Sequence, residues 1–280
     1  IIRVKPDSKL GWKLSQIPLA QSALISLNSK NGAIQSLVGG LNFSHNKFNR
    51  VTQSKRQPGS SFKPFIYSSA ISSGYSAASI INDAPVVFND PNLASAWRPT
   101  NDGGKFYGPT RIRQALYRSQ NIVSVRLLDE MGVRPTLEFL RRFGFDPQEL
   151  PNNLSLSLGS ANLSPLQIAT GYAVLSNGGF QVKPYIIDKV LGRDGEELYR
   201  SRPITVCERC TPLELEEETE ASLASALFDT DEGVQTLPVA PQVLDPEVDY
   251  IVYDMMRDVI KYGTGRRARV LKRDDIAGKT

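Results

Sequence analysis

The chain has 280 residues, of which 40% are hydrophobic and 22% are charged, and its formal net charge is +4. This composition is typical of a folded globular protein long enough to bury a sizeable core, and it excludes a disordered or fibrous one. The sequence has no run of about 18 apolar residues, so it predicts no membrane-spanning helix in this stretch.

Histidine and cysteine usage narrows the chemistry further. The single histidine, His45, excludes metal sites and motifs that need two histidines, and its polar surroundings disfavour a Ser-His-Asp triad. A nucleophilic serine would then use a lysine or a carboxylate as its base. The two cysteines, Cys207 and Cys210, have a spacing shared by half a zinc site, a redox pair, a small disulfide loop and two idle thiols. We expect no metal and no cofactor.

In the first part of the chain, residues 1–20 are irregular and indicate a linker or the edge of an upstream domain. Apolar runs at 23–28 and 33–38 flank Asn31-Gly32, which predicts a β-hairpin. Helical spacing predicts a helix that starts at Ser60, tolerates Pro64 in its first turn and closes at Gly74. Residues 76–110 are rich in proline and glycine and are predicted to form a loop.

The second part is predicted to be mainly helical. Helical patterns occupy residues 112–131 with a polar interruption at 119–121, then 135–143, 164–177 and 250–262. A hairpin is expected at 185–199 around Asp194-Gly195, an acidic insertion with a helical run at 213–228 is expected within 201–247, and a strand is expected at the last residues. This order favours an α+β fold, with helices segregated on an antiparallel sheet in a domain of residues 21–280.

A basic cluster near the end of the sequence has two interpretations. Either it is a solvated face or it is a site for an anionic ligand. No nucleic-acid motif accompanies it, so we expect no nucleic-acid partner. The cluster consists of Arg266, Arg267, Arg269, Lys272 and Arg273.

Ser60 and Lys63 lie three residues apart at a predicted helix start and therefore share one face. A lysine whose pKa is lowered by burial or by neighbouring cations can activate a serine hydroxyl. The spacing alone is weak, because Ser44 and Lys47 have it too. Order strengthens it: Ser-x-x-Lys is followed by Ser119-Gln120-Asn121 and then by Lys279-Thr280, the arrangement of β-lactamases and penicillin-binding proteins.

The segment Arg56–Phe65 closely resembles the nucleophile segment of class A penicillin-binding proteins. Further segments similar to that family are Leu37–Gly40, Trp97–Asn101, Ser119–Asn121, Leu158–Gly179 and Gly263–Gly265. The resemblance covers nearly the whole chain and is specific in combination. It implies a penicillin-binding transpeptidase fold with an antiparallel sheet packed against helices, and further strands after Thr280.

The resemblance also implies a role for each motif residue. Ser60 would attack a D-Ala carbonyl of a peptidoglycan stem peptide, and Lys63 would be its base. Ser119 would relay a proton to the leaving amine, and Asn121 would hold Lys63 and the substrate amide. Lys279 and Thr280 would bind the terminal carboxylate. The sequence departs from the pattern at Gln120, where the family often has Asp, and the glycine of Lys-Thr-Gly would follow Thr280.

For the whole protein, the resemblance implies a periplasmic domain of an inner-membrane protein, with an upstream glycosyltransferase domain and a membrane anchor. Its partners would be lipid II and peptidoglycan stem peptides, and β-lactams would acylate it. In that oxidising compartment Cys207 and Cys210 would form a disulfide.

Two alternatives stay open. A β-lactamase would need a carboxylate for deacylation, and Glu149 and Asn153 have a reminiscent spacing within a loop. A non-catalytic binding module would leave the serine and lysine incidental.

Overall fold

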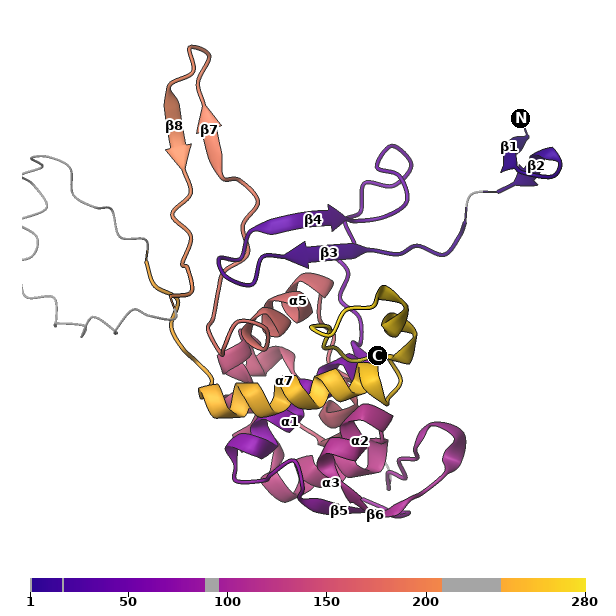
Figure 1. Cartoon of the computed structure of the whole chain (residues 1–280), viewed down its shortest axis with the longest axis vertical. Coiled ribbons are helices and arrows are strands. Elements are labelled where there is room, and N and C mark those ends of the chain that lie inside the picture. Colours follow the sequence, from indigo (N-terminus) through magenta and orange to yellow (C-terminus); the bar gives the residue numbers. More distant parts are fainter. Residues whose placement is uncertain (1, 17, 89–95, 208–237) are drawn as a thin grey trace, which may run out of the picture.

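The computed structural model describes residues 2–16, 18–88, 96–207 and 238–280. Figure 1 shows a helical body in which α1 is surrounded by other helices, with the β3–β4 hairpin above it and the β7–β8 hairpin extending away from it. The β1–β2 hairpin lies apart from this body, at the end of an extended segment (Figure 1).

The helix α1 (Lys63–Ser72) forms the centre of the core. Every residue from Lys63 to Ile71 is buried, including the polar residues Lys63, Ser68 and Ser69, because other elements pack around the helix. It contacts α7 (Pro246–Lys261), α3 (Asn121–Met131) and α4 (Val133–Leu140). Lys63, one of the candidate site residues, is the first residue of α1. Packing of this helix into the core therefore also fixes the position of Lys63.

Two further helices, α2 (Ile112–Arg118) and α5 (Pro165–Val174), complete the α-helices of the described residues. Short 3-10 segments connect them: η1 (Gly59–Phe62), η2 (Asp102–Gly104), η3 (Arg141–Phe143), η4 (Pro147–Glu149), η5 (Leu154–Leu158) and η6 (Arg266–Leu271).

The strands of the described residues form four separate antiparallel pairs. These are β1 (Arg3–Asp7) with β2 (Gly11–Ser15), β3 (Leu24–Leu27) with β4 (Ile34–Val38), β5 (Ile80–Asp83) with β6 (Gly108–Arg111), and β7 (Lys189–Leu191) with β8 (Glu197–Arg200). Only small antiparallel sheets therefore accompany the helices, and β3 packs on α5.

Several expectations from the sequence are confirmed. The hairpins at 23–38 and 185–199 form, and the helical pattern at 112–131 is broken into α2 and α3 at the polar residues. At α5, Ser164 accepts from the Gln167 N–H while the Gln167 side chain accepts from the Ser164 N–H, so the helix begins with a capping box.

Other expectations are wrong. The α-helix begins at Lys63 rather than Ser60, because the residues before Pro64 form the 3-10 turn η1 instead. Residues 1–20 contain the hairpin β1–β2, and the Pro- and Gly-rich stretch at 76–110 contains β5–β6. Pro109 is accommodated in β6 because a two-stranded pair has an open edge where a missing N–H is tolerated.

The strand expected at the last residues is also absent from the described part of the chain. Residues 276–280 have no strand conformation, since a strand exists only as a hydrogen-bonded pair and none of the described strands pairs with them. The helical run expected at 213–228 and Cys210 lie outside the described residues, so the Cys207–Cys210 disulfide stays a prediction.

Candidate active site

Ser60 lies in the turn η1 and faces a cavity of about 920 Å³. The turn is fixed by a close backbone approach: the N–H of Gly59 donates to the carbonyl of Gly159 at 3.2 Å. A Cβ on Gly159 would lie 2.1 Å from the Gly59 carbonyl oxygen, so this position requires glycine. The Tyr172 hydroxyl of α5 also donates to the carbonyl of Ser61 at 2.8 Å. Two distant segments thus hold the turn that carries Ser60.

Lys63, one turn further on, has no exposed surface. Its ammonium nitrogen Nζ donates to the carbonyls of Ser119 (2.7 Å) and Gln120 (3.1 Å) and to Oδ1 of Asn121 (2.8 Å). Nζ also lies 3.4 Å from the Ser119 hydroxyl, which in turn donates to Ser60 Oγ at 3.0 Å. The structure therefore joins Lys63 to Ser60 through Ser119.

Ser119 is placed by the break between α2 and α3. It has a φ of 58°, in the left-handed region that non-glycine residues seldom adopt. This single left-handed residue ends α2 and turns the chain so that the Ser119 and Gln120 carbonyls both point at Lys63. Such backbone strain costs on the order of 1 kcal/mol and persists where the surroundings impose it.

A buried polar network imposes that geometry. The Asp83 carboxylate accepts from the side-chain amides of Asn101 (2.8 and 2.9 Å) and Gln120 (3.0 Å). Oδ1 of Asn101 accepts from the backbone N–H groups of Asn121 (2.7 Å) and Ile122 (3.2 Å) and so caps the start of α3. Sequence reasoning missed Asp83, because no local pattern marks a carboxylate whose partners lie 18 and 37 positions away.

The end of the chain completes the cluster. Lys279 Nζ donates to the Ser119 hydroxyl at 2.8 Å, and the Thr280 hydroxyl donates to the Thr264 hydroxyl at 2.5 Å. Thr280 and Thr264 line the same cavity as Ser60. The structure thus brings together all six residues singled out from the motifs: Ser60, Lys63, Ser119, Asn121, Lys279 and Thr280.

Burial shapes the protonation of both lysines. Desolvation, and then the positive charge of Lys279, lower the pKa of Lys63 to about 7, while desolvation lowers the pKa of Lys279 to about 8. The carbonyl acceptors around Lys63 oppose this, because they stabilise the ammonium form. Near neutral pH both the charged and the neutral form of Lys63 are therefore populated. The hydroxyl of Ser119 connects Lys63 to Ser60.

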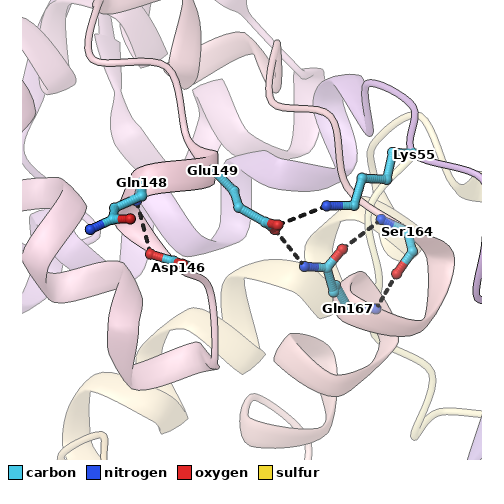
Figure 2. A network of polar contacts seen from close by, with 6 residues as sticks. All are labelled: Lys55, Asp146, Gln148, Glu149, Ser164 and Gln167. Atoms are coloured by element: carbon cyan, nitrogen blue, oxygen red, sulfur yellow. Dashed lines mark hydrogen bonds and ion pairs between the residues drawn. The ribbon is translucent and has the colours of Figure 1, made fainter.

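Glu149 lies elsewhere. Its carboxylate accepts from Lys55 Nζ at 2.7 Å and from the side-chain amide of Gln167 at 3.1 Å, as Figure 2 shows. The hydrogen bond from Lys55, followed by that from Gln167, keeps the pKa of Glu149 below its usual range. Asn153 caps η5 by accepting from the Ser155 N–H at 3.0 Å. Neither residue lines the Ser60 cavity, so the contacts of Glu149 brace the chain before η1 against α5.

The competing Ser-x-x-Lys pair, Ser44 and Lys47, is exposed in a loop, as is His45. Within the described residues, no three His, Cys, Asp or Glu side chains gather as metal ligands. No helix in the described part is long and apolar enough to cross a membrane.

Residues 23–280 match the family model for the penicillin-binding protein transpeptidase domain. The chain is 45% identical to penicillin-binding protein 1A of Pseudomonas aeruginosa, over 100% of this chain and 36% of that protein. It is 41% identical to penicillin-binding protein 1A of Vibrio cholerae, over 100% of this chain and 34% of that protein. The chain thus spans about a third of the length of these curated relatives.

Solved structures of penicillin-binding proteins have a similar fold. The crystal structure of penicillin-binding protein 1A from Haemophilus influenzae has a TM-score of 0.87 and 36% identity, covering 100% of this chain and 42% of that one. The penicillin-binding protein PonA1 from Mycobacterium tuberculosis has a TM-score of 0.64 at 21% identity, covering 87% and 58%, and shows a likeness of fold alone.

Proposed function

Because this chain belongs to the penicillin-binding protein transpeptidase family, we propose that it is a serine-type D,D-transpeptidase whose nucleophile is Ser60. The observation that carries the proposal is the hydrogen-bonded path from Ser60 through Ser119 to Lys63, inside a cavity large enough for a peptide. The substrate is a peptidoglycan stem peptide, which lipid II would supply.

Acylation begins with Ser60 Oγ attacking the carbonyl of the penultimate D-Ala. Hydroxyl hydrogens rotate, so the Ser60–Ser119 hydrogen bond can run in either direction. The Ser60 proton passes through Ser119 to neutral Lys63, which acts as general base. The C–N bond to the terminal D-Ala then breaks, the leaving amine takes the proton back through Ser119, and an ester on Ser60 remains.

The other motif residues serve this step. Asn121 fixes the Lys63 ammonium nitrogen through Oδ1 and would present its amide to the substrate. Lys279 supplies positive charge beside Ser119, and the Thr280 hydroxyl would bind the carboxylate of the terminal D-Ala. β-Lactams, which carry an equivalent carboxylate and a strained amide, would acylate Ser60 in the same way.

For the whole protein we propose a second, glycosyltransferase domain upstream, a membrane anchor and a periplasmic location for this domain. The much greater length of the curated relatives supports this arrangement. In that oxidising compartment Cys207 and Cys210 would form a disulfide peripheral to the site.

Labelling with a fluorescent penicillin tests the function. Ser60→Ala should abolish labelling and leave the circular dichroism spectrum unchanged. The matched control is Ser44→Ala, which removes the serine of the other Ser-x-x-Lys pair and should label normally. Labelling that survives in Ser60→Ala, or disappears in Ser44→Ala, would falsify the assignment of the nucleophile.

A further inference from the structure

A pocket of about 570 Å³ with basic walls lies where α7 ends and the chain turns through η6. We infer that this basic pocket binds the acceptor of the reaction, an acidic second stem peptide whose amine attacks the ester on Ser60. The inference rests on the proposed function. The charged residues of the basic pocket are Lys261, Arg266, Arg269, Lys272, Arg273 and Asp274.

The basic pocket adjoins the Ser60 cavity. Tyr262 and Arg266 line both hollows, so one extended ligand can occupy the two together. The segment between them, Gly263–Gly265, is held against α2, because the Thr264 N–H donates to the Tyr117 carbonyl at 3.2 Å. A Cβ on Gly263 would lie 2.2 Å from that same carbonyl oxygen. The wall shared by the two hollows is therefore fixed in place.

The charge of the basic pocket is strongly one-sided. Five cations and one carboxylate line it, a formal balance of +4 from +5 and −1. Arg273 donates to the Asp275 carboxylate at 2.9 and 2.5 Å. Among the described residues, the other four cations form no ion pair. Clustered like charges repel one another, so a ligand that brings carboxylates is favoured here.

The position of the basic pocket selects the acceptor among anionic ligands. In the second half of the reaction the acceptor amine attacks the ester carbonyl of acyl-Ser60. A C–N bond forms, the C–Oγ bond breaks, and the amine proton returns to Ser60 Oγ through Ser119. The acceptor must therefore reach into the Ser60 cavity while the rest of its chain leaves it, and the exit past Tyr262 and Arg266 leads to the cations. A lipid headgroup would have no need of this connection.

The competition between two fates of the acyl-enzyme tests the inference. In the whole protein, a peptide ending in D-Ala-D-Ala serves as donor, and the ratio of aminolysis to hydrolysis products is measured by mass spectrometry. Two acceptors are compared: an acidic peptide and the same peptide with its carboxylates amidated. The variant is Arg269→Gln/Lys272→Gln, whose residues line the basic pocket but not the Ser60 cavity. The charge-matched control is Lys189→Gln/Arg193→Gln, in the exposed β7–β8 hairpin.

The variant should lower the aminolysis-to-hydrolysis ratio roughly 3- to 10-fold for the acidic acceptor, the scale of two exposed ion pairs. The ratio for the amidated acceptor and both ratios of the control should not change. In the unsubstituted protein, added salt should erase the advantage of the acidic acceptor. The single variants Arg269→Gln and Lys272→Gln should each give part of the effect, which guards against a misfolded double variant.

An unchanged ratio for the acidic acceptor overturns the inference, as does an equal fall for both acceptors. Loss of binding to anionic phospholipid vesicles together with an unchanged ratio assigns the pocket to a membrane surface instead and likewise overturns it. Penicillin labelling of Ser60, run in parallel, tests the proposed function by itself: labelling with an unchanged ratio refutes the acceptor site alone.

Discussion

At the scale of single residues, the decisive feature is a lysine with no exposed surface and no carboxylate among its hydrogen-bond partners. Lys63 is surrounded by uncharged acceptors and faces the second cation of the site, Lys279, across Ser119. A carboxylate beside it would hold its proton. Uncharged carbonyls hold it less firmly, so the lysine can exchange a proton near neutral pH.

The pKa of about 7 for Lys63 predicts how acylation depends on pH. If Lys63 is the base, as proposed, it works when neutral, so the penicillin acylation rate should rise with pH and level off above pH 7. Replacing Lys279 by Gln removes a neighbouring positive charge. The loss of this charge favours the ammonium form of Lys63 and raises its pKa. The acid limb of the profile should therefore move to higher pH in Lys279→Gln, apart from any change in maximal rate.

Rates measured from about pH 5 to about pH 9 would check this, because the range brackets the shifted lysine but not an ordinary one. Lys183→Gln, which removes an exposed lysine elsewhere, is the control and should leave the profile in place. A Lys279→Gln profile that superimposes on that of the unsubstituted protein would mean that Lys279 does not tune Lys63.

At the scale of elements, the site is assembled from the turn η1, the α2–α3 break and the last residues. Each carries a motif that the local sequence could predict. The sequence alone shows the order of Ser60, Ser119 and Lys279, and it also shows the polar interruption of a helical pattern. What fixes these elements could not be predicted. Asp83 acts through partners brought near by folding, and the glycine at 159 matters only because η1 lies against it.

The contact between η1 and the loop after η5 predicts a large effect of one methyl group. Gly159 and Gly103 both have a φ of 73°, so alanine at either position is strained by about 1 kcal/mol. A Cβ at Gly103 meets nothing within 4 Å, whereas one at Gly159 meets the Gly59 backbone at 2.1 Å. Gly159→Ala should thus lose about 3 kcal/mol or more of unfolding free energy and acylate poorly.

Urea unfolding of the two variants, with penicillin labelling of each, makes the comparison. Gly103→Ala should lose about 1 kcal/mol and keep its labelling. Similar losses of stability in both variants would show that the backbone angle, not the contact with η1, decides the cost.

At the scale of the whole molecule, stability resides in the helical body around α1. The N-terminal hairpin β1–β2 contributes its apolar side chains to no core, because Trp12 and Leu14 remain 65% and 72% exposed. Figure 1 shows the same separation. Its strands were not expected from the sequence. Neither strand buries one face, and it is a buried face that the alternation of apolar and polar residues marks in a sequence. The helices, by contrast, carry caps and periodicity that a sequence reveals.

Deleting residues 1–20 should accordingly leave the thermal unfolding midpoint and the rate of penicillin acylation unchanged. Deleting residues 1–38 also removes β3 and β4, and β3 packs on α5. That longer deletion should lower the midpoint, because it exposes the apolar side chains that β3 covers. Calorimetry of both forms would check the pair of expectations. A fall in the midpoint for the shorter deletion would place β1–β2 within the cooperative unit.

The hydrogen bonds of the candidate site join residues that are far apart in the sequence. Ser119 meets Ser60 across 59 positions of sequence, and Lys279 meets Ser119 across 160. Such distant pairings form late, because long loops must close before the contact stabilises anything. During synthesis Ser60, the proposed nucleophile, leaves the ribosome long before Lys279 does. Reactivity toward penicillin should then arise in one step near the completion of folding. A molecule labelled by penicillin is therefore one in which these distant segments have already folded together.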